Sequence, residues 1–342
     1  MDILRVGIIG FGRIGAEHAG WLEKCAGIRA TAAADATPAR REMARQRGLI
    51  VHERFEALLA DPDIDAILIS TPTSMHFDQA SAALAAGKHV MIEKPIATTL
   101  EEARRLTESA VKQNRILSVF HNRRWDADFL TVKSAIESGT FGKVINVESR
   151  LGQWASCVGP AAKEYRPNWR NESAFGGGAM FDWGSHFVDQ IWQLLLPAKP
   201  VRVFAQLRQN VWSKDCDDIA RICIDFDNGA VGLVEINTTT TLPLPRWHID
   251  GTAGSAHSPY SLEFDVSRWA ELEFKPASGA GDYCLPAASG GLNEIQIWDR
   301  FADAIAGHGK PAVNIESVLP TMALLDAARE SSRSGYAVSI SI

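Results

Sequence analysis

The chain has 342 residues, of which 46% are hydrophobic and 22% are charged, and its formal net charge is −6. This length exceeds what a single compact core usually holds, so we expect two domains. The mild excess of negative charge argues against nucleic acid or an anionic membrane surface as a partner, because both require basic patches.

No stretch of the sequence reaches the roughly 18 consecutive apolar residues that a membrane span needs. The five cysteines are scattered and form no CxxC pair. The apolar beginning of the chain contains Arg5 and is not followed by a small-residue cleavage site, so it lacks the marks of a signal peptide. These features predict a cytoplasmic protein with reduced thiols.

Up to residue 121, short apolar strands alternate with helices. We expect strands over 4–10, 28–35, 64–70, 89–93 and 116–121, and helices from residue 13 and over 37–47, 74–86 and 99–114. Continuous apolar strands that alternate with helices are typical of a parallel sheet covered on both faces. Residues 1–121 are therefore predicted to form an α/β Rossmann domain with a doubly wound parallel sheet.

After residue 121 the pattern changes to runs of neighbouring strands. Helices are expected over 126–137, 179–196, 295–306 and 315–332, and strands over 144–151, 201–209, 220–226, 230–240, 246–251, 261–265 and 271–275. Asn228-Gly229 indicates a hairpin between two of these strands. Residues 122–342 are predicted to form an α+β C-terminal domain with a large open, mainly antiparallel sheet, which binds the substrate.

A G-x-G-x-x-G motif follows the first strand and opens the first helix. In such a motif the first glycine allows a tight turn, the second lets the backbone approach a pyrophosphate, and the third permits close packing of helix and strand. The helix N-terminus adds partial positive charge. The motif predicts a dinucleotide site, and its residues are Gly10, Phe11, Gly12, Arg13, Ile14 and Gly15.

Asp35 ends the second strand, where the adenosine ribose of a dinucleotide would lie. A carboxylate there accepts hydrogen bonds from the ribose hydroxyls and repels a 2′-phosphate, which favours NAD over NADP. Arg40 and Arg41 follow closely, however, and an arginine can hold a 2′-phosphate. Their alternative role is a solvated helix face.

Two further loops follow strands at the carboxyl edge of the predicted sheet, where ligands bind. The first contains Thr71, Pro72 and His76, and we expect it along the nicotinamide side of the cofactor. His76 is either a contact or a brace of the loop. The second contains Glu93 and Lys94, which either form a structural ion pair or serve the site, Lys94 by binding the substrate hydroxyl.

The segment 176–186, GGGAMFDWGSH, combines a glycine-rich loop with a helix that carries Asp182 and His186. These two lie four residues apart, so a helix places them on one face, where they can transfer a proton from a hydroxyl. The alternatives are a structural pair and a metal site. We find no third ligand at a suitable spacing and expect no metal.

Together, GFGRIG at 10–15, EKP at 93–95 and GGGAMFDWGSH at 176–186 resemble the Gfo/Idh/MocA family of oxidoreductases along the whole chain. The resemblance implies a catalytic role for Lys94, Asp182 and His186. His186 would be the general base, Lys94 would polarise the hydroxyl, and Asp182 would position the substrate and the histidine. It also implies dimers or tetramers formed through the C-terminal sheet.

The segment from His121 to Asp126 resembles sugar and cyclitol members of this family. Ten tryptophans, most of them in the second half, are suited to core packing or to stacking on sugar rings. The loop 153–175 would cover the pocket. The candidates for substrate binding, besides the three catalytic residues, are Arg123, Arg124, Trp154, Tyr165 and Trp169, with Arg246 as a further possibility.

We therefore expect an NAD-dependent dehydrogenase, with NADP as the less favoured cofactor, that oxidises a hydroxyl of a sugar, a sugar derivative or an inositol-like cyclitol. Two alternatives follow from the same resemblance. One is a cofactor-binding regulator or sensor, although such relatives tend to lose the catalytic lysine or histidine. The other is an NAD-dependent glycosidase.

Overall fold

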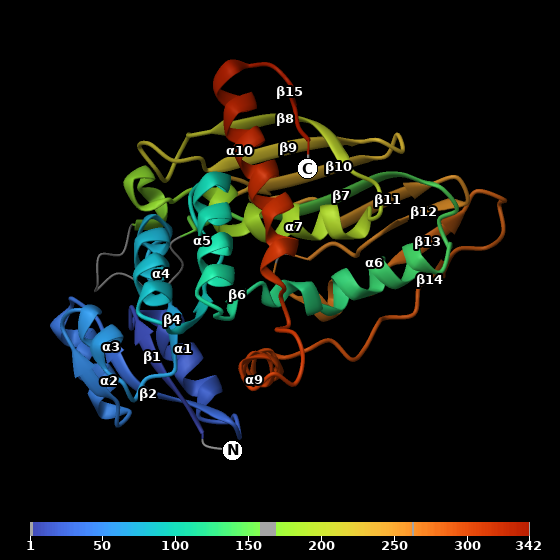
Figure 1. The fold of residues 1–342 in the computed structure, drawn as a ribbon. Helices are drawn as coiled ribbons and strands as arrows, with labels where there is room; N and C mark the ends of the chain where they lie inside the picture. The colour runs from blue at the N-terminus through green and yellow to red at the C-terminus, as the bar shows by residue number, and fades with distance from the viewer. Residues whose placement is uncertain (1–2, 158–168, 262, 342) are drawn as a thin grey trace.

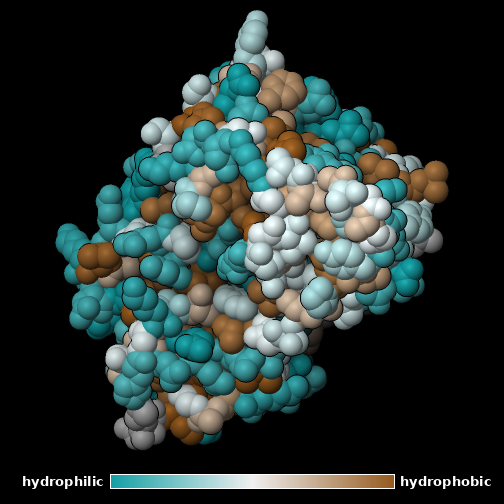
Figure 2. Space-filling view, turned by 90° about the vertical axis from the view of Figure 1, so that its right-hand side faces the viewer, coloured by the Kyte–Doolittle hydropathy of each residue, from teal (hydrophilic) through white to brown (hydrophobic). Residues whose placement is uncertain are grey.

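The computed structural model describes residues 3–157, 169–261 and 263–341. Figure 1 shows two sheets, each with its own helices, and the chain passing between them. Polar residues cover most of the side of the molecule seen in Figure 2, and hydrophobic residues are scattered among them. No helix of the described residues is long and apolar enough to cross a membrane.

The first sheet has six parallel strands in the order β3-β2-β1-β4-β5-β6. The strand order reverses beside β1, which creates the crevice where doubly wound sheets bind ligands. The predicted Rossmann topology is confirmed, with β3 and α3 as elements that the sequence patterns missed. The strands are β1 (Leu4–Ile9), β2 (Ile28–Ala34), β3 (Ile50–His52), β4 (Ala66–Ile69), β5 (His89–Ile92) and β6 (Leu117–Val119).

Helices cover both faces of this sheet because its strands are apolar on both sides; all four residues of β4 are fully buried. The last helix, α5, begins with a capping box in which Thr99 Oγ1 accepts a hydrogen bond from the Glu102 N–H at 3.2 Å. The helices are α1 (Arg13–Leu22), α2 (Pro38–Gln46), α3 (Glu56–Ala60), α4 (His76–Ala85) after the 3₁₀ turn Thr73–Met75, and α5 (Leu100–Lys112).

The second sheet has nine strands in the order β14-β13-β12-β11-β7-β10-β9-β8-β15. Within this sheet, β7 and β10 are the only parallel pair among the described residues. The predicted, mainly antiparallel sheet is therefore confirmed. The strands are β7 (Val144–Gly152), β8 (Pro200–Arg208), β9 (Ile219–Phe226), β10 (Val231–Asn237), β11 (Trp247–Gly251), β12 (Gly254–His257), β13 (Glu273–Pro276), β14 (Tyr283–Cys284) and β15 (Val338–Ser339).

Three helices lie on the same face of the second sheet, and no helix of the described residues covers the other face (Figure 1). They are α6 (Ala127–Glu137), α7 (Ser185–Leu194) and α10 (Leu319–Ser334), the last preceded by the 3₁₀ turn Ile315–Val318. The hairpin predicted at Asn228-Gly229 joins β9 to β10, and Gly229 has the positive φ of +84° that this turn requires.

The prediction of a strand over 261–265 is wrong. The described residues of this segment form no strand, and the short helix α8 (Val266–Trp269) follows instead. The reason is local: the Asp265 side chain accepts hydrogen bonds from the Ser267 and Arg268 N–H groups, both at 3.0 Å, and so begins a helix. Strand β12 was not predicted.

The chain returns to the first sheet late in its course. After β14, helix α9 (Glu294–Ile305) packs beside α1, and Ile297, Trp298 and Phe301 share a core with Val6 and Ile8 of β1. The division of the chain at residues 121 and 122 stays a prediction. In space, however, α9 from the second part completes the packing of the first sheet.

Candidate active site

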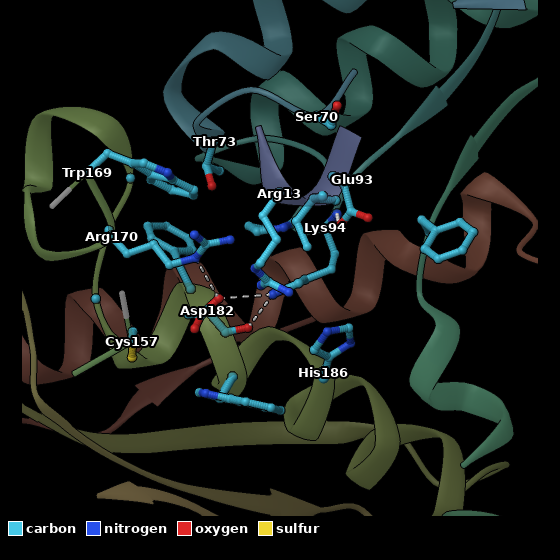
Figure 3. A pocket seen from close by; sticks show the side chains of 18 of the residues that line it. Arg13, Ser70, Thr73, Glu93, Lys94, Cys157, Trp169, Arg170, Asp182 and His186 are labelled. Atoms are coloured by element: carbon cyan, nitrogen blue, oxygen red, sulfur yellow. Dashed lines mark hydrogen bonds and ion pairs between the residues drawn. The ribbon is translucent and has the colours of Figure 1, made fainter. Parts of the chain in front are cut away.

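A cavity of about 500 Å³ lies between the carboxyl edge of the first sheet and the helix side of the second. This volume is in the range of small-molecule sites. Its walls come from the glycine-rich loop, the loops after β4 and β5, the turn after β6, and the segment before α7. Figure 3 shows Arg13, Lys94, Arg170, Asp182 and His186 turned toward one another across it.

The glycine-rich loop has the shape that a dinucleotide pyrophosphate requires. Gly10 has a φ of +88°, a backbone conformation that favours glycine. A Cβ on Gly15 would lie 2.2 Å from the Gly10 carbonyl oxygen, so this position has no room for a side chain. A Cβ on Gly12 would meet only the Arg40 guanidinium, 3.8 Å away, among the described residues. The first turn of α1 contains no acidic residue and no side-chain cap. Its N–H groups can therefore bind phosphate.

Asp35 lies beyond the end of β2 and is almost completely buried. Its Oδ2 accepts a hydrogen bond from the Phe11 N–H at 2.8 Å, and its Oδ1 accepts one from the Thr37 N–H at 2.8 Å. Asp35 thereby ties the glycine-rich loop to the beginning of α2. Arg40 lies 3.7 Å from the same Oδ2, which places one acid and one base at the ribose end of the motif.

Arg41 does not share this position. Its guanidinium donates to the Asp35 and Ala36 carbonyl oxygens at 2.8 and 3.0 Å, so Arg41 braces the backbone. Of the residues predicted to bind the cofactor, those that line the cavity are Arg13, Ile14, Thr71, His76, Glu93 and Lys94. The side chain of Phe11 lies in the hydrophobic core instead, so only its main chain belongs to the site. Pro72 is not part of the cavity wall.

His76 is a brace of its loop. Its Nδ1 lies 2.8 Å from the Pro95 carbonyl oxygen and its Nε2 lies 3.0 Å from the Thr71 carbonyl oxygen. The imidazole thus joins the loop after β4 to the loop after β5. Burial lowers the pKa of His76. A neutral ring donates to one of the two carbonyls.

Lys94, Asp182 and Arg170 form a charged cluster at the reacting end of the cavity (Figure 3). Lys94 Nζ donates to the Asp182 main-chain oxygen at 2.7 Å and to Asp182 Oδ1 at 3.3 Å, and Arg170 Nε lies 3.4 Å from the same Oδ1. Burial raises the pKa of Asp182, but Lys94 and Arg170 outweigh burial and leave that pKa below its ordinary value. Asp182 is therefore ionised and fixes the position of the ammonium group.

Asp182 belongs to a π-helical turn, Met180–Gly184, that leads directly into α7. Such turns widen a helix locally and are frequent at functional sites. Asp182 and His186 both face the cavity, although no hydrogen bond joins their side chains among the described residues. The aspartate holds Lys94, and the histidine stands apart from it.

Glu93 supports Lys94 from the side of the first sheet. Its carboxylate lies 2.8 Å from His18 Nε2, and His18 Nδ1 in turn accepts a hydrogen bond from Trp298 Nε1 at 3.1 Å. The Nε2–H of His18 must therefore donate to Glu93. Burial raises the pKa of Glu93, but His18 and Lys94 outweigh burial and lower it. The predicted alternative, a direct ion pair between the Glu93 and Lys94 side chains, is not formed; Lys94 binds Asp182.

His186 is 5% exposed, and its Nδ1 is buried without a hydrogen-bond partner among the described residues. Burial, followed by the charges of Lys94 and Arg123, lowers its pKa well below 6.5. The imidazole is therefore neutral near pH 7 and can accept a proton. Because His186 lines the cavity and Nδ1 is buried, Nε2 is the nitrogen that a substrate can reach.

The substrate candidates divide into those at the cavity and those elsewhere. Arg123 and Trp169 line it, and the Arg123 guanidinium stacks over the Trp183 and Phe264 rings at 4.9 and 4.4 Å. Arg124 does not: it forms two hydrogen bonds with Asp189, at 2.8 and 2.7 Å, and braces the junction.

Of the three remaining candidates, two do not line the cavity and one cannot be assigned. Trp154 is 55% exposed, packs against Trp212 and is not part of the cavity wall, so its expected role in substrate binding is corrected. Tyr165 lies outside the described residues. Arg246 is buried, and its guanidinium is 3.3 Å from Asp128 and 2.6 Å from Gln190 Oε1, beneath the cavity.

Sequence reasoning missed Arg170 and Asn122, which both line the cavity. Arg170 directly follows Trp169 in a loop that was expected to cover the pocket, but only the folded chain shows its contact with Asp182. Asn122 precedes Arg123 and was passed over beside two arginines. Among the described residues, no group of three or more His, Cys, Asp or Glu could hold a metal ion.

The fold and this cavity define a dinucleotide-binding oxidoreductase of two parts. Residues 4–121 match the family model described as "Oxidoreductase family, NAD-binding Rossmann fold", and residues 129–257 match the "GFO/IDH/MocA C-terminal domain". The chain belongs to the GFO/IDH/MocA family. This confirms the resemblance carried by the three sequence motifs.

Similar proteins include dehydrogenases named for inositols. The chain is 35% identical to scyllo-inositol 2-dehydrogenase (NADP(+)) IolW of Bacillus subtilis over 48% of this chain and 44% of that protein. It is 30% identical to myo-inositol 2-dehydrogenase of Thermotoga maritima over 68% of each. The first curated relatives are matched over 44% to 60% of their length.

The fold as a whole resembles a solved structure. An NAD-binding protein from Listeria innocua superposes with a TM-score of 0.88 at 30% identity, over 99% of this chain and 97% of that one. The likeness therefore includes both sheets.

Proposed function

We propose that the protein is an NAD(P)-dependent dehydrogenase that oxidises a hydroxyl group of a sugar, a sugar derivative or an inositol-like cyclitol. The observation that carries this proposal is the cluster at the reacting end of the cavity: an ammonium group held by an ionised carboxylate, next to a neutral imidazole. This cluster lies beside a loop shaped for a pyrophosphate. The inositol dehydrogenases among the similar proteins agree with this choice of substrate class.

NAD(P)⁺, when bound, supplies the carbon that accepts a hydride. The residues of this chain do the rest. Lys94 donates a hydrogen bond to the substrate oxygen and stabilises the negative charge that develops on it. His186 Nε2 takes the hydroxyl proton as the hydride leaves the substrate carbon that bears this hydroxyl, and that carbon becomes a carbonyl carbon. Asp182 keeps the ammonium group in place, and Trp169 and Trp183 offer flat apolar surfaces to the ring of the substrate.

We propose NAD as the preferred cofactor. The carboxylate of Asp35 at the ribose end repels a 2′-phosphate, and it is fixed there by two backbone hydrogen bonds. Arg40 reduces this preference because its guanidinium lies beside the same carboxylate. The NADP dependence in the name of one relative makes this a point to measure.

A substrate screen tests the proposed function. The purified protein is incubated with NAD⁺ or NADP⁺ and a set of aldoses, sugar acids and inositol isomers, and reduced nicotinamide is followed by absorbance. We expect turnover with at least one member of the set. Tight cofactor binding without any turnover would favour a sensor, and release of sugar from an aryl glycoside without net reduced cofactor would favour a glycosidase.

We further propose that the helix-free face of the second sheet joins two copies of the chain. Phe204, Cys223 and Leu233 lie next to one another on three adjacent strands of that face, with the Arg221–Glu235 ion pair beside them. An apolar row flanked by paired charges suits a symmetric interface. Light scattering during size-exclusion chromatography would show a dimer or tetramer, and Leu233→Glu would reduce it to a monomer.

We propose the cytoplasm as the location. All five cysteines are free thiols in the structure, as expected in a reducing compartment. Fractionation of the source cells, with detection by an antibody, would test this.

A further inference from the structure

His121 is a buried histidine that the reaction proposed above does not use. It follows β6 at the junction of the two parts, and its side chain is 1% exposed. Neither ring nitrogen has a hydrogen-bond partner among the described residues, and the ring is not part of the cavity wall. A buried polar group without a partner costs about 1–3 kcal/mol. Such a group therefore calls for an explanation.

The neighbour of His121 is His186. Their ring centroids are 5.7 Å apart, and the rings are nearly perpendicular, at 85°. His186 Nδ1 is also buried and unpartnered within the described part of the chain. At this separation no direct hydrogen bond joins the two rings, and a gap remains between their nitrogens. A small shift or one bridging water closes that gap.

The proposed chemistry requires one tautomer of His186. To accept the substrate proton at Nε2, the neutral ring must carry its hydrogen on Nδ1. The tautomer of a histidine is set by the hydrogen bond that its other nitrogen makes. No carboxylate or carbonyl bonds Nδ1 among the described residues, and His121 is the unpartnered group next to it.

We propose that His121 is a positioning residue of the active site: one of its ring nitrogens accepts the Nδ1–H of His186, directly or through one water molecule, and so keeps Nε2 free to take the substrate proton. This inference rests on the proposed function for its role in turnover, but the tautomer of His186 can be observed without a substrate.

The charges around the two rings agree with this arrangement. Lys94 follows β5, Arg123 lies after β6, and Arg246 precedes β11; all three disfavour a charged His186. Around His121, Lys94 and Arg124 are opposed by Asp189 of α7 and Glu93, and burial is the largest influence, lowering its pKa to about 4. His121 is therefore neutral near pH 7 and keeps a lone pair with which to accept a hydrogen bond.

The test compares His121→Phe with His121→Gln. Phenylalanine fills the space but cannot accept a hydrogen bond, whereas glutamine can. His89→Phe serves as the control, because it removes a half-buried histidine at the far end of β5. NMR of protein with ¹⁵N-labelled histidine, with NAD⁺ bound, reports the tautomer of His186; the His186→Gln variant assigns its signal.

In the wild type and in His121→Gln we expect the Nδ1–H tautomer. In His121→Phe we expect the Nε2–H form to gain, with a kcat lower by roughly tenfold or more, by analogy with the loss of the second partner of a metal-bound histidine. The cofactor Kd should change by less than about twofold.

An unchanged tautomer in His121→Phe would overturn the inference, whether or not a substrate is known. So would an equal loss of kcat in both His121 variants, because it would show that the ring only packs. If the tautomer changes as expected but no substrate is turned over by the wild type, the proposed function fails while the pairing of His121 with His186 stands.

Discussion

The two ends of the cavity treat their buried polar groups differently. On the side of the first sheet, both oxygens of Asp35 accept backbone hydrogen bonds, and the chain Trp298–His18–Glu93 behind Lys94 is bonded at every link. At the reacting end, His186 and His121 keep three buried ring nitrogens without partners among the described residues.

This difference shows where the fold has completed its own bonding and where it keeps bonding capacity for chemistry. Satisfied polar networks add rigidity and are costly to disturb. Unsatisfied groups cost stability and are retained where a function requires them. We therefore expect the loss of a bonded group such as His18 to reduce stability, and the loss of an unpartnered group such as His186 to reduce turnover.

The largest effect is expected for Lys94→Met. Its removal deprives the substrate oxygen of its hydrogen-bond donor, so kcat should fall by about 10³-fold, within the range for general acid–base groups. The measurement is steady-state oxidation of the best substrate from the screen, with cofactor binding followed by fluorescence of reduced nicotinamide. Thr107→Val, on the outer helix α5, should keep full activity. Wild-type turnover in Lys94→Met would remove this residue from the mechanism.

The second largest effect is the difference in the free energy of unfolding between His18→Leu and His121→Leu. Leucine at 18 leaves Glu93 and Trp298 Nε1 buried without their partner, which should cost about 2–4 kcal/mol in the free energy of unfolding. Leucine at 121 removes two buried ring nitrogens that have no partner among the described residues, and this gain offsets the loss of the acceptor proposed for His186 Nδ1, so that free energy should change by less than about 1 kcal/mol. Urea denaturation measures both. Equal losses would contradict the distinction between the two ends.

A change in cofactor choice is expected for Asp35→Asn. The amide no longer repels a 2′-phosphate, and its oxygen still accepts one backbone hydrogen bond. The ratio of kcat/KM for NADP to that for NAD should rise by about tenfold, which corresponds to about 1.4 kcal/mol. Arg40→Ala should move the ratio the other way. If both variants shift it in the same direction, Asp35 and Arg40 do not oppose each other.

The smallest effect is a shift of the pH profile in Arg123→Gln. The positive charge of Arg123 helps to keep the pKa of His186 below 6.5. Without that charge, protonation of His186 becomes easier and its pKa rises. The acidic limb of the pH profile of kcat should then move to higher pH, by about half a unit to one unit. A limb that stays in place or moves to lower pH would show that another group controls it.

The sequence patterns predicted the elements whose local signals agree with their environment. The capping box at Thr99 and the hairpin at Asn228-Gly229 are examples, and the glycine-rich loop is another. The spacing of the glycines in this loop is enough to indicate the role of each one. The position of Lys94 was predicted because the carboxyl edge of a parallel sheet is a fixed place in this fold. Asp182 and His186 were joined to it by the resemblance that the three motifs carry, and all three line one cavity.

The remainder depended on contacts between distant residues. Arg123 and Arg124 are adjacent and chemically identical, yet one faces the cavity and the other binds Asp189 on α7. Nothing local separates them. The contact of Arg170 with Asp182 and that of His121 with His186 likewise arise only when the loops are folded together.

The return of α9 to the first sheet has a mechanical consequence. The chain crosses between the two parts three times, after β6, before α9 and again between α9 and α10. Two domains joined by a single linker can rotate widely about it, whereas three chain crossings at separate points restrict the two parts to small sliding movements. Cutting the backbone at one crossing would therefore leave the two parts held together by the remaining crossings and by the packing of α9 on the first sheet.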